Sequence, residues 1–420
     1  MKIKSTTGKL KTLSQVICLL GFGINLAYAD QNIEIIGGNS AGNPKLAIVN
    51  FANDDGSISD EISSDFKITG EFNVTNYTSE ASVNKASQYI ITGKVTTDPV
   101  TNQRQISYQL KNALTKTNLL DQTITFSLAN QRKAVHTLDD IIYKQLTNTP
   151  SDFTSRIALA VQQNSGRYAI VVADYDGYNQ KTLISMPHPI TSLAWDSSGK
   201  YLSYVTYETG KPVAYVQNIQ QGSRYSVANF NGSNSSPTFS NNSQQLAVTL
   251  SKDYGSHIYL VSNQRYTALS RAIPLINYGT IDTEADIAST GKVVFTSDHD
   301  GGPQIFMTDL NGSTPIRLTS KLGNYNTTAR FSNDGSKITF INRNNGVLQT
   351  YVLDLVTNSA YPVSMNANHD IAPSFAPNDK LIMFSSDNNV YISNVTGTTQ
   401  TKLNNLSYRQ IIDQRWAKNF

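Results

Sequence analysis

The stretch FSNDGSKITFI at residues 331–341 joins an apolar anchor, a polar turn and a run of strand-forming residues. Its Asp-Gly pair favours a tight hairpin turn. The β-branched and aromatic residues that follow alternate with polar ones, as in a half-buried strand. The same pattern returns with anchors at Trp195 (WDSSGKYLSYV), Phe239 (FSNNSQQLAVT), Ile287 (IASTGKVVFT), Phe375 (FAPNDKLIMF) and, in a shorter copy, Trp416 (WAKNF).

The anchors recur at successive spacings of 44, 48, 44, 44 and 41 residues. A period of roughly 40–50 residues that holds several short strands is typical of the blades of a β-propeller. The last anchor has no strand after it, whereas residues 156–161 (RIALAV) form a strand-like run without a partner. We therefore predict that this run completes the blade of Trp416 and that six blades close into a ring. A β-sandwich that does not close is the alternative, because periodicity alone does not prove closure.

The region before the repeats has a different pattern. Strand-like runs occupy residues 45–51, 89–95, 104–110 and 123–128. Two helices are predicted from apolar residues at helical spacing, which are Ile58, Ile62 and Phe66 in the first and Val135, Leu138, Ile141, Ile142 and Leu146 in the second, over residues 130–146. We predict two domains, a small N-terminal α/β domain at residues 44–150 and an all-β six-bladed β-propeller at residues 151–420.

Residues 1–29 have the composition of a secretory signal peptide. Four lysines precede a short apolar run at residues 16–26, and Ala27-Tyr28-Ala29 has the form of a cleavage site. A membrane anchor is the alternative, but the run is far shorter than the ~20 residues of a spanning helix. We predict cleavage before Asp30, a mobile tail at residues 30–43 and export to the periplasm.

Removal of this segment changes the charge of the protein. The whole chain has a net charge of +3, with 34 basic and 31 acidic residues. The segment takes four lysines and no acidic residue, so 30 basic residues remain against 31 acidic ones, a net charge of −1. The basic balance that would favour nucleic-acid binding is therefore lost. The single Cys leaves as well, which excludes a disulfide or a thiolate metal site in the mature chain.

Three motifs invite a catalytic or metal-binding interpretation. Residues 38–42 match the G-x-S-x-G of a nucleophile elbow, but a strand is expected after them where that motif needs a helix. The runs DYDGYN at 174–179 and DHDGG at 298–302 contain several possible metal ligands. Each falls between two expected strands, so a hairpin turn explains it better. We predict no catalytic residue, no cofactor and no metal site, and we expect any ligand or partner to bind at the central channel.

Four strings along the chain resemble the TolB family, the periplasmic component of the Tol–Pal cell-envelope system. They are IEIIGGNSAGNPKLAIVNF at 33–51, ADYDGYNQ at 173–180, AWDSSGKYLSYVTYETGKP at 194–212 and TSDHDGGPQIF at 296–306. The resemblance covers the mature chain in the same order and departs from the family at the anchors Ile287 and Phe331. It implies a monomeric, non-enzymatic adaptor that supports outer-membrane integrity and envelope constriction at cell division, without nucleic-acid binding or membrane insertion.

The resemblance also implies two partners. The peptidoglycan-associated lipoprotein Pal would dock at the propeller mouth, on residues that precede the anchors of the inner strands: Ser233, Ser236, Thr283, Glu284, Asn326, Thr327, His369 and Asp370. The family commonly has His at the position of Ser233. The inner-membrane protein TolA would bind the tail through Asp30, Ile33, Glu34, Ile35, Ile36, Asn39 and Ser40, and the two binding events would be coupled.

Two other classes of function remain open from the residues themselves. A periplasmic hydrolase or lyase would need titratable groups that converge in the channel. A sugar- or peptide-binding propeller would suit the 22 tyrosines of the chain, although most of these are expected to pack between blades.

Overall fold

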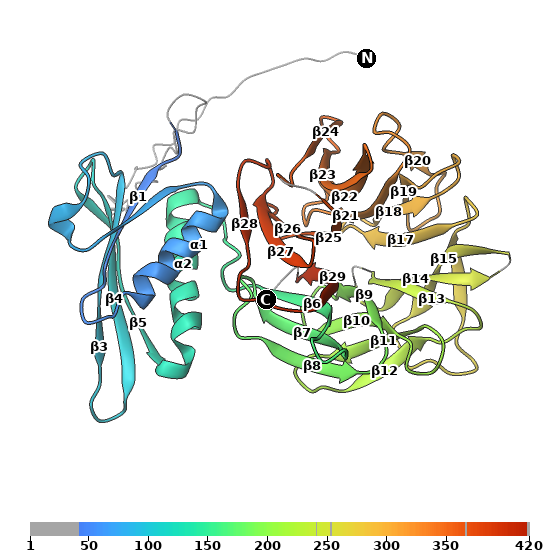
Figure 1. Cartoon of the computed structure of the whole chain (residues 1–420), viewed down its shortest axis with the longest axis horizontal. Coiled ribbons are helices and arrows are strands. Elements are labelled where there is room, and N and C mark those ends of the chain that lie inside the picture. Colours follow the sequence, from blue (N-terminus) through green and yellow to red (C-terminus); the bar gives the residue numbers. More distant parts are fainter. Residues whose placement is uncertain (1–41, 241, 253, 366–367, 418–420) are drawn as a thin grey trace, which may run out of the picture. The chain divides into compact units, whose positions relative to one another are not determined.

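The computed structural model describes residues 42–240, 242–252, 254–365 and 368–417, and these lie in one compact unit. They form one five-stranded sheet, which comes first in the chain, and six four-stranded sheets (Figure 1). No helix within these ranges has the length and apolar character needed to cross a membrane. The predicted signal peptide and most of the predicted tail lie outside the described residues, and the domain bounds at residues 43 and 150 stay predictions.

The first sheet is mixed and belongs to the N-terminal α/β region. Its strand order is β2-β1-β3-β4-β5, with β1 parallel to both neighbours and β3, β4 and β5 antiparallel. The elements of the region are β1 (Lys45–Val49), α1 (Ser57–Thr69), β2 (Asn73–Tyr77), η1 (Glu80–Ser82), β3 (Tyr89–Thr97), β4 (Gln103–Asn112), β5 (Thr117–Ser127), η2 (Leu128–Asn130) and α2 (Gln131–Thr147). The α/β region is therefore confirmed. The edge strand β2 was not predicted, because its sequence NVTNY is largely exposed and lacks an apolar alternation.

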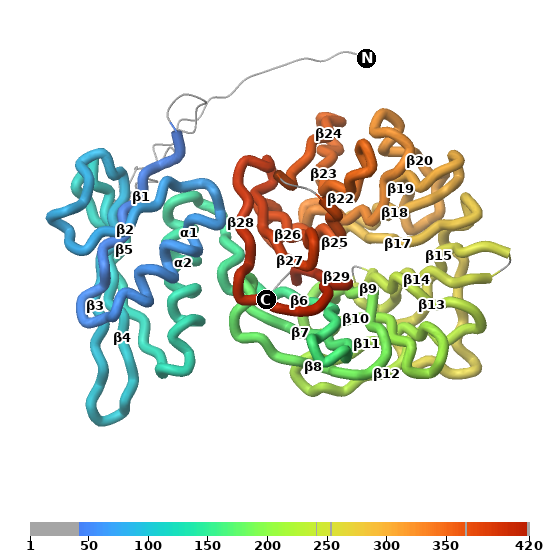
Figure 2. Tube along the Cα trace, in the orientation of Figure 1, coloured from blue at the N-terminus to red at the C-terminus, as the bar shows by residue number. Residues whose placement is uncertain are grey.

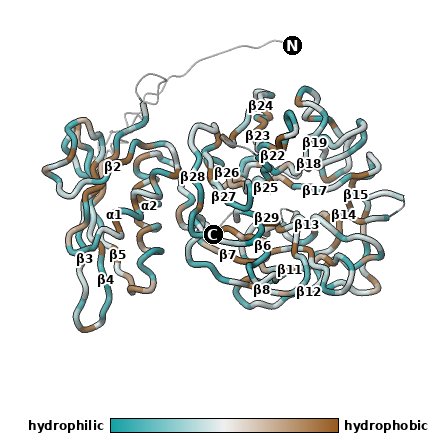
Figure 3. The backbone as a smooth tube through the Cα atoms, viewed as in Figure 1, coloured by the Kyte–Doolittle hydropathy of each residue, from teal (hydrophilic) through white to brown (hydrophobic). Residues whose placement is uncertain are grey.

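The two helices bury the apolar residues that predicted them, except Ile141, which is only partly buried. Ile58, Ile62 and Phe66 of α1 are fully buried, as are Val135 and Leu138 of α2. The helices contact each other and the strands of the sheet. Hydrophobic and hydrophilic positions alternate along the trace of both helices and strands (Figure 3). Each helix also buries a carboxylate, Asp65 in α1 and Asp139 in α2.

The other six sheets are the blades of the propeller, and every strand in them pairs antiparallel with its neighbour. The blades, written from the inner strand outward, are β29 (Gln410–Trp416), β6 (Arg156–Gln162), β7 (Tyr168–Asp174) and β8 (Lys181–Met186); β9 (Ile190–Trp195), β10 (Tyr201–Thr206), β11 (Val213–Asn218) and β12 (Arg224–Ala228); β13 (Asn234–Phe239), β14 (Gln245–Lys252), β15 (Gly255–Ser262) and β16 (Ala272–Ile276); β17 (Asp282–Ile287), β18 (Lys292–Ser297), β19 (Gln304–Asp309) and β20 (Ile316–Arg317); β21 (Asn326–Phe331), β22 (Lys337–Asn344), β23 (Val347–Asp354) and β24 (Ser359–Pro362); and β25 (Asp370–Phe375), β26 (Leu381–Ser386), β27 (Asn389–Asn394) and β28 (Gln400–Lys402).

The ring closes as predicted. The strand β29 near the C-terminus pairs with β6, with Trp416 opposite Ile157. The inner strands contact one another in the order β9, β13, β17, β21, β25 and β29, and β29 contacts β9 again. Figure 2 follows the chain from blade to blade through this ring. Six blades are therefore confirmed, and an open sandwich is excluded.

Each anchor is the last residue of an inner strand and is buried. Apolar clusters between neighbouring blades contain five of these side chains, those of Trp195, Phe239, Ile287, Phe331 and Phe375. Trp195, for example, packs with Ala158 and Ile170 of the preceding blade, and Phe239 packs with Val205 and Val216 of the blade before it. The repeated anchor thus marks the residue that joins one blade to the next.

Hydrogen bonds of Trp416 connect the closing strand β29 to β25 on one side and to the residue before β6 on the other. Its backbone N–H donates to Ser374 Oγ at 3.0 Å, and its indole Nε1 donates to Ser155 Oγ at 2.7 Å. We expect Trp416→Ala to lower the free energy of unfolding by about 3–5 kcal/mol, because it removes a buried aromatic side chain and one of its hydrogen bonds. Urea unfolding followed by circular dichroism measures this. Val356→Ala is the control, because Val356 is 81% exposed, and a change within about 0.5 kcal/mol is expected.

A loss at Trp416 no larger than that of the control would contradict this account. It would mean that the backbone pairing of β29 with β6 closes the ring without the anchor.

Candidate partner-binding site in the central channel

The inner strands share an unusual backbone conformation at their third residue. Ser192, Ser236, Glu284, Thr328 and Ala372 have φ angles of 60°, 49°, 57°, 59° and 50°. This left-handed region is uncommon for residues other than Gly. The pairing of each inner strand with its neighbour shifts register at the same place, and β29 has the same shift. Six β-bulges therefore lie at one level of the ring, where they redirect side chains.

The bulges surround a cavity of about 290 Å³, to which all six inner strands contribute residues. Most of the lining consists of Ser, Thr and small apolar side chains. Four charged residues are placed among them: Glu284, Arg330, Asp413 and Arg415. The two acidic and two basic groups balance one another in charge.

Hydrogen bonds fix the acidic groups to the next blade. Glu284 of β17 accepts from the backbone N–H of Thr328 at 2.9 Å and from its hydroxyl at 3.1 Å. Asp413 of β29 accepts from the backbone N–H of Leu193 in β9 at 2.6 Å. These side chains therefore connect adjacent inner strands around the channel.

The basic groups bind backbone carbonyls of other inner strands. Arg330 Nη1 donates to Glu284 O at 3.1 Å, and Arg415 Nε donates to Leu193 O at 2.8 Å. All four charged groups thus have fixed positions in the wall of the cavity. Such preorganised polar groups suit recognition of a partner that reaches into the channel.

Two of the predicted residues have buried side chains that bond to the neighbouring blade. Asn326 and Asp370 are the first residues of β21 and β25, and both are fully buried. Asn326 Nδ2 donates to Gln304 Oε1 at 2.9 Å, and Asp370 Oδ2 accepts from the backbone N–H of Thr350 at 2.9 Å. Asn234 and Asp282 are buried at the same position in two other blades. Asn326 and Asp370 therefore join their inner strands to the preceding blade.

The other predicted residues lie closer to the surface. Ser236 and Glu284 line the cavity itself. Ser233 and Thr327 are partly buried just before and just inside their strands, and Thr283 is partly buried and accepts a hydrogen bond from the hydroxyl of Thr249 at 3.2 Å. His369 is exposed. A role of these residues in partner binding stays a prediction, and the predicted tail residues, from Asp30 to Ser40, lie outside the described residues.

Sequence reasoning missed Arg330, Asp413 and Arg415. A signal for the two arginines was present, since each stands directly before an anchor, Phe331 or Trp416. Alignment of the repeats on their anchors would have shown that this position carries a basic residue in two blades. Asp413 had no such signal, because its place in the wall depends on the closing strand.

The carboxyl group of Asp413 provides a test of the channel. Burial raises its pKa to about 6, against the lowering effect of the Leu193 N–H and of the Arg330 charge. The folded protein therefore binds this proton more tightly than the unfolded chain, in which an Asp has a pKa of ~3.9. Above pH ~6 Asp413 is ionised in the folded protein, and this lowers the free energy of unfolding. The free energy of unfolding rises again as the pH falls towards ~4.

We expect the wild type to gain up to about 2 kcal/mol of unfolding free energy relative to Asp413→Asn between pH 7.5 and pH 4.5. Urea unfolding of both proteins at several pH values measures the difference, and the comparison removes the contributions of all other groups. A difference that does not change with pH would show that Asp413 titrates normally.

Comparisons with known proteins agree with this architecture. The chain matches the family described as "TolB beta propeller domain" over residues 143–418. The Tol-Pal system protein TolB of Bordetella pertussis (strain Tohama I) is 33% identical over 326 residues, which cover 73% of this chain and 73% of that protein. The protein of the same name from Francisella tularensis subsp. mediasiatica is 27% identical over 318 residues, or 72% of this chain and 71% of that one.

A solved structure extends the similarity to the whole fold. The crystal structure of TolB from Acinetobacter baumannii superposes with a TM-score of 0.78 at 27% sequence identity, and the match covers 89% of this chain and 96% of that one. The similarity therefore includes the α/β region as well as the propeller.

Proposed function

This chain belongs to the TolB family, and from that premise we propose that it is a non-enzymatic periplasmic adaptor of the Tol–Pal system. The family match over residues 143–418 is the observation that carries the proposal. The channel supports it, because both of its acidic side chains accept hydrogen bonds from neighbouring strands and none of the four charged groups stands isolated as an acid or base would. As an adaptor, it would support outer-membrane integrity and envelope constriction at cell division.

The first proposed partner is a Pal-like lipoprotein, which would dock where the inner strands begin. Polar residues that are partly buried or exposed gather there, including Thr283, Thr327 and His369. Apolar side chains are exposed close by: Ile281 is 50% exposed directly before β17, and Met365 is 52% exposed before β25. Apolar contacts among polar groups are typical of protein interfaces. This composition supports a protein partner.

The alternatives have weaker support. A hydrolase or a sugar- or peptide-binding protein would use the cavity itself, whose volume of about 290 Å³ is at the lower limit of small-molecule sites. Each of its four charged groups already makes a hydrogen bond to the backbone of a neighbouring inner strand. A partner that covers the mouth and inserts only a few side chains fits this geometry better.

Replacement of Glu284 tests docking at the mouth. We expect Glu284→Arg to weaken capture of the Pal-like lipoprotein by about 2 kcal/mol or more, because it reverses a charge that a basic residue of the partner would meet. Isothermal titration calorimetry with the soluble domain of the lipoprotein measures the affinity. Glu80→Arg is the matched control, since Glu80 lies in η1 of the α/β region with an exposed side chain.

The exposed His369 provides a second variant that leaves the hydrogen bonds of Glu284 intact. His369→Ala should also weaken capture while the melting temperature stays unchanged. Wild-type affinity in both variants would place the partner elsewhere and contradict the proposal.

The second proposed partner is a TolA-like inner-membrane protein that binds the N-terminal tail. Removal of residues 30–41 from the mature chain should abolish this binding and leave the melting temperature nearly unchanged. The deletion stops before Asn43, because Asn43 Nδ2 donates to Gly70 O at 2.6 Å and is part of the fold. Pull-down with the TolA-like domain and a thermal melt measure the two effects. Retained binding would contradict the assignment.

A further inference from the structure

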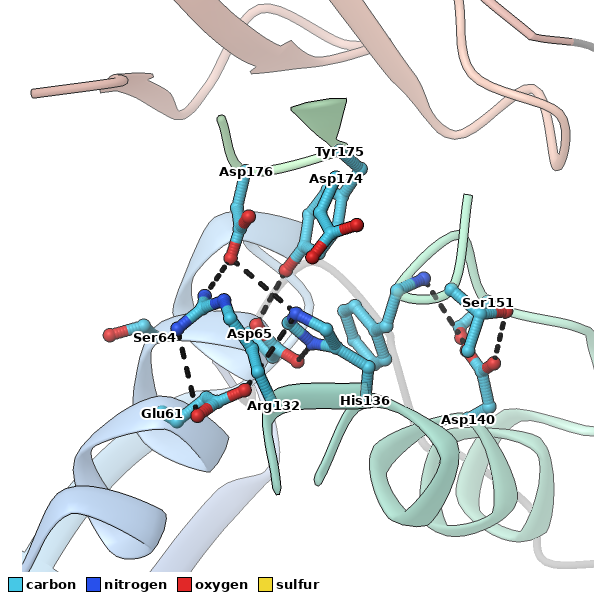
Figure 4. Close-up of polar contacts among 12 residues, drawn as sticks. Glu61, Ser64, Asp65, Arg132, His136, Asp140, Ser151, Asp174, Tyr175 and Asp176 are labelled. Carbon is cyan, nitrogen blue, oxygen red and sulfur yellow. Dashed lines mark hydrogen bonds and ion pairs between the residues drawn. The ribbon is translucent and has the colours of Figure 1, made fainter. Parts of the chain in front are cut away.

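Largely buried ionisable side chains from three elements meet where the α/β region contacts the first blade (Figure 4). Glu61 and Asp65 come from α1, Arg132 and His136 from α2, and Asp176 from the turn between β7 and β8. The two residues of each helix are four positions apart, so they share one helix face. These five residues are here called the joint cluster.

The turn between β7 and β8 is the part of the propeller that reaches the joint cluster. Residues 174–179 form the hairpin turn that the sequence predicted. Asp176 of this turn forms an ion pair with Arg132. The hydroxyl of Tyr175 donates to Asp65 Oδ1 at 2.6 Å. Polar contacts therefore connect the first blade with both helices of the α/β region.

His136 is the centre of the joint cluster, and its side chain is only 3% exposed. Its Nδ1 lies 2.7 Å from Asp65 Oδ2. Its Nε2 lies 3.6 Å from Asp176 Oδ2 and 3.7 Å from Glu61 Oε1. Both ring nitrogens therefore face carboxyl groups. Such surroundings favour the imidazolium form, which carries a hydrogen on each nitrogen and a positive charge.

Glu61 contributes a carboxyl group that is poorly placed for a negative charge. Its side chain is only 9% exposed, and Oε1 has no hydrogen-bond partner among the described residues. The other oxygen, Oε2, lies 3.6 Å from Arg132 Nη1, which is longer than a charge-assisted hydrogen bond. Burial without hydrogen bonds disfavours the charged form of a carboxyl group. The geometry therefore favours a proton on Glu61.

Two protons balance the charges of the joint cluster. Asp65 and Asp176 carry two negative charges. Arg132 and a protonated His136 carry two positive ones, and a neutral Glu61 leaves this balance intact. Ionisation of Glu61 adds one unbalanced negative charge, and loss of the His136 proton adds a second. Unbalanced charges are costly in a largely buried place.

The pKa values of the two groups agree with this balance. Burial raises the pKa of Glu61 to about 7, against the lowering effect of the charges of Arg132 and His136. Burial alone would lower the pKa of His136, but the charge and hydrogen bond of Asp65 and the charges of the other two carboxyl groups raise it to about 9. In an unfolded chain the corresponding pKa values are ~4.3 for Glu and ~6.5 for His.

The direction of the pH dependence follows from these values. The folded protein binds both protons more tightly than the unfolded chain does, so both stabilise it at low pH. The stabilisation from Glu61 is lost as the pH rises from ~4.3 to ~7, and that from His136 is lost between ~6.5 and ~9. Above about pH 7 the joint cluster therefore becomes progressively more negative.

Other titratable groups face the joint cluster from the elements around it. Burial raises the pKa of Asp139 and of Asp140 in α2, so these carboxyl groups act in the same direction as Glu61. Burial also raises the pKa of Tyr175, so its hydroxyl keeps the hydrogen that it donates. Asp60 of α1 and Lys402 of β28 line the cavity of about 440 Å³ beside the cluster. Both are exposed, and solvent screens their charges.

We propose that the joint cluster is a pH-sensitive contact, in which protons on Glu61 and His136 hold the α/β region against the first blade and their loss in alkaline medium loosens it. A second contact between the two regions has no part in this: Lys380 Nζ lies 2.8 Å from Glu71 Oε1 at the sixth blade. The loosening is therefore local to the first blade. It does not depend on which partners the protein binds.

Hydrogen–deuterium exchange of the full mature chain tests the proposal. Mass spectrometry measures the exchange of residues 174–180, where Tyr175 N–H donates to Ser155 O at 3.1 Å. Rates at about pH 6 and about pH 8.5 are divided by the intrinsic rates of an unfolded peptide at the same pH. We expect the protection of this segment to fall about 100-fold between the two pH values, because both protons are bound less tightly once the contact opens.

Residues 292–309, which form β18 and β19, are the internal control and should keep their protection. A fall of less than about tenfold at residues 174–180 would overturn the proposal. An equal fall in both segments would also overturn it, because the whole fold and not the joint cluster would then open.

Replacement of Glu61 by a residue that is neutral at every pH isolates the effect of its proton. In Glu61→Gln the fall in protection should be about tenfold smaller than in the wild type. Glu71→Gln is the matched control, because it removes a carboxylate from the contact with Lys380, and its pH dependence should equal that of the wild type. A fall in Glu61→Gln as large as in the wild type would contradict the role of Glu61.

Replacement of His136 tests the second proton. His136→Asn removes the positive charge and keeps an N–H group towards Asp65, so residues 174–180 should already have low protection at about pH 6. His257→Asn is the matched control: His257 is also buried, with Nδ1 3.1 Å from Asp282 Oδ2 in the propeller, and the protection should not change. Wild-type protection in His136→Asn would contradict the role of His136.

Discussion

The pairing of β29 with β6 is the interaction on which the rest of the molecule depends. A propeller blade is stable only when its apolar faces are covered by the blades on both sides. Without β29, the first blade would lack its inner strand, and the sixth blade would lack a neighbour. The same strand also supplies Asp413 and Arg415 to the channel wall. Closure of the ring and formation of the channel are therefore one event.

The repeat made most of the fold predictable, because each anchor carries its own physical requirement for burial. Trp195, Phe239 and Trp416 all end inner strands, as their spacing indicated. The short strand β2 escaped prediction, because it has exposed polar residues and is held by backbone pairing with β1. Whether such a segment forms a strand is determined by tertiary contacts, and a local sequence pattern does not contain these.

The candidate sites were harder to predict than the fold. Ser236, Glu284 and Ala372 adopt left-handed backbone conformations although none of them is Gly, so nothing local marks the bulges. Asp65, His136 and Asp176 come from two helices and a turn that are far apart in the chain, and the fold brings them together. Asp176 was noticed as part of an acidic motif, but only the fold shows that His136 faces it.

The closing pair has a consequence for the order in which the protein is made. The residues of β6 are synthesised long before those of β29, and Trp416 must return to Ile157 across the whole sequence of blades. Contacts between such distant parts of a chain form slowly. Until translation reaches the closing strand, the first blade therefore remains incomplete, and the inner edge of β6 has no partner strand. An unpaired edge of this kind can pair with another chain, so the closing strand also protects the newly made protein from aggregation.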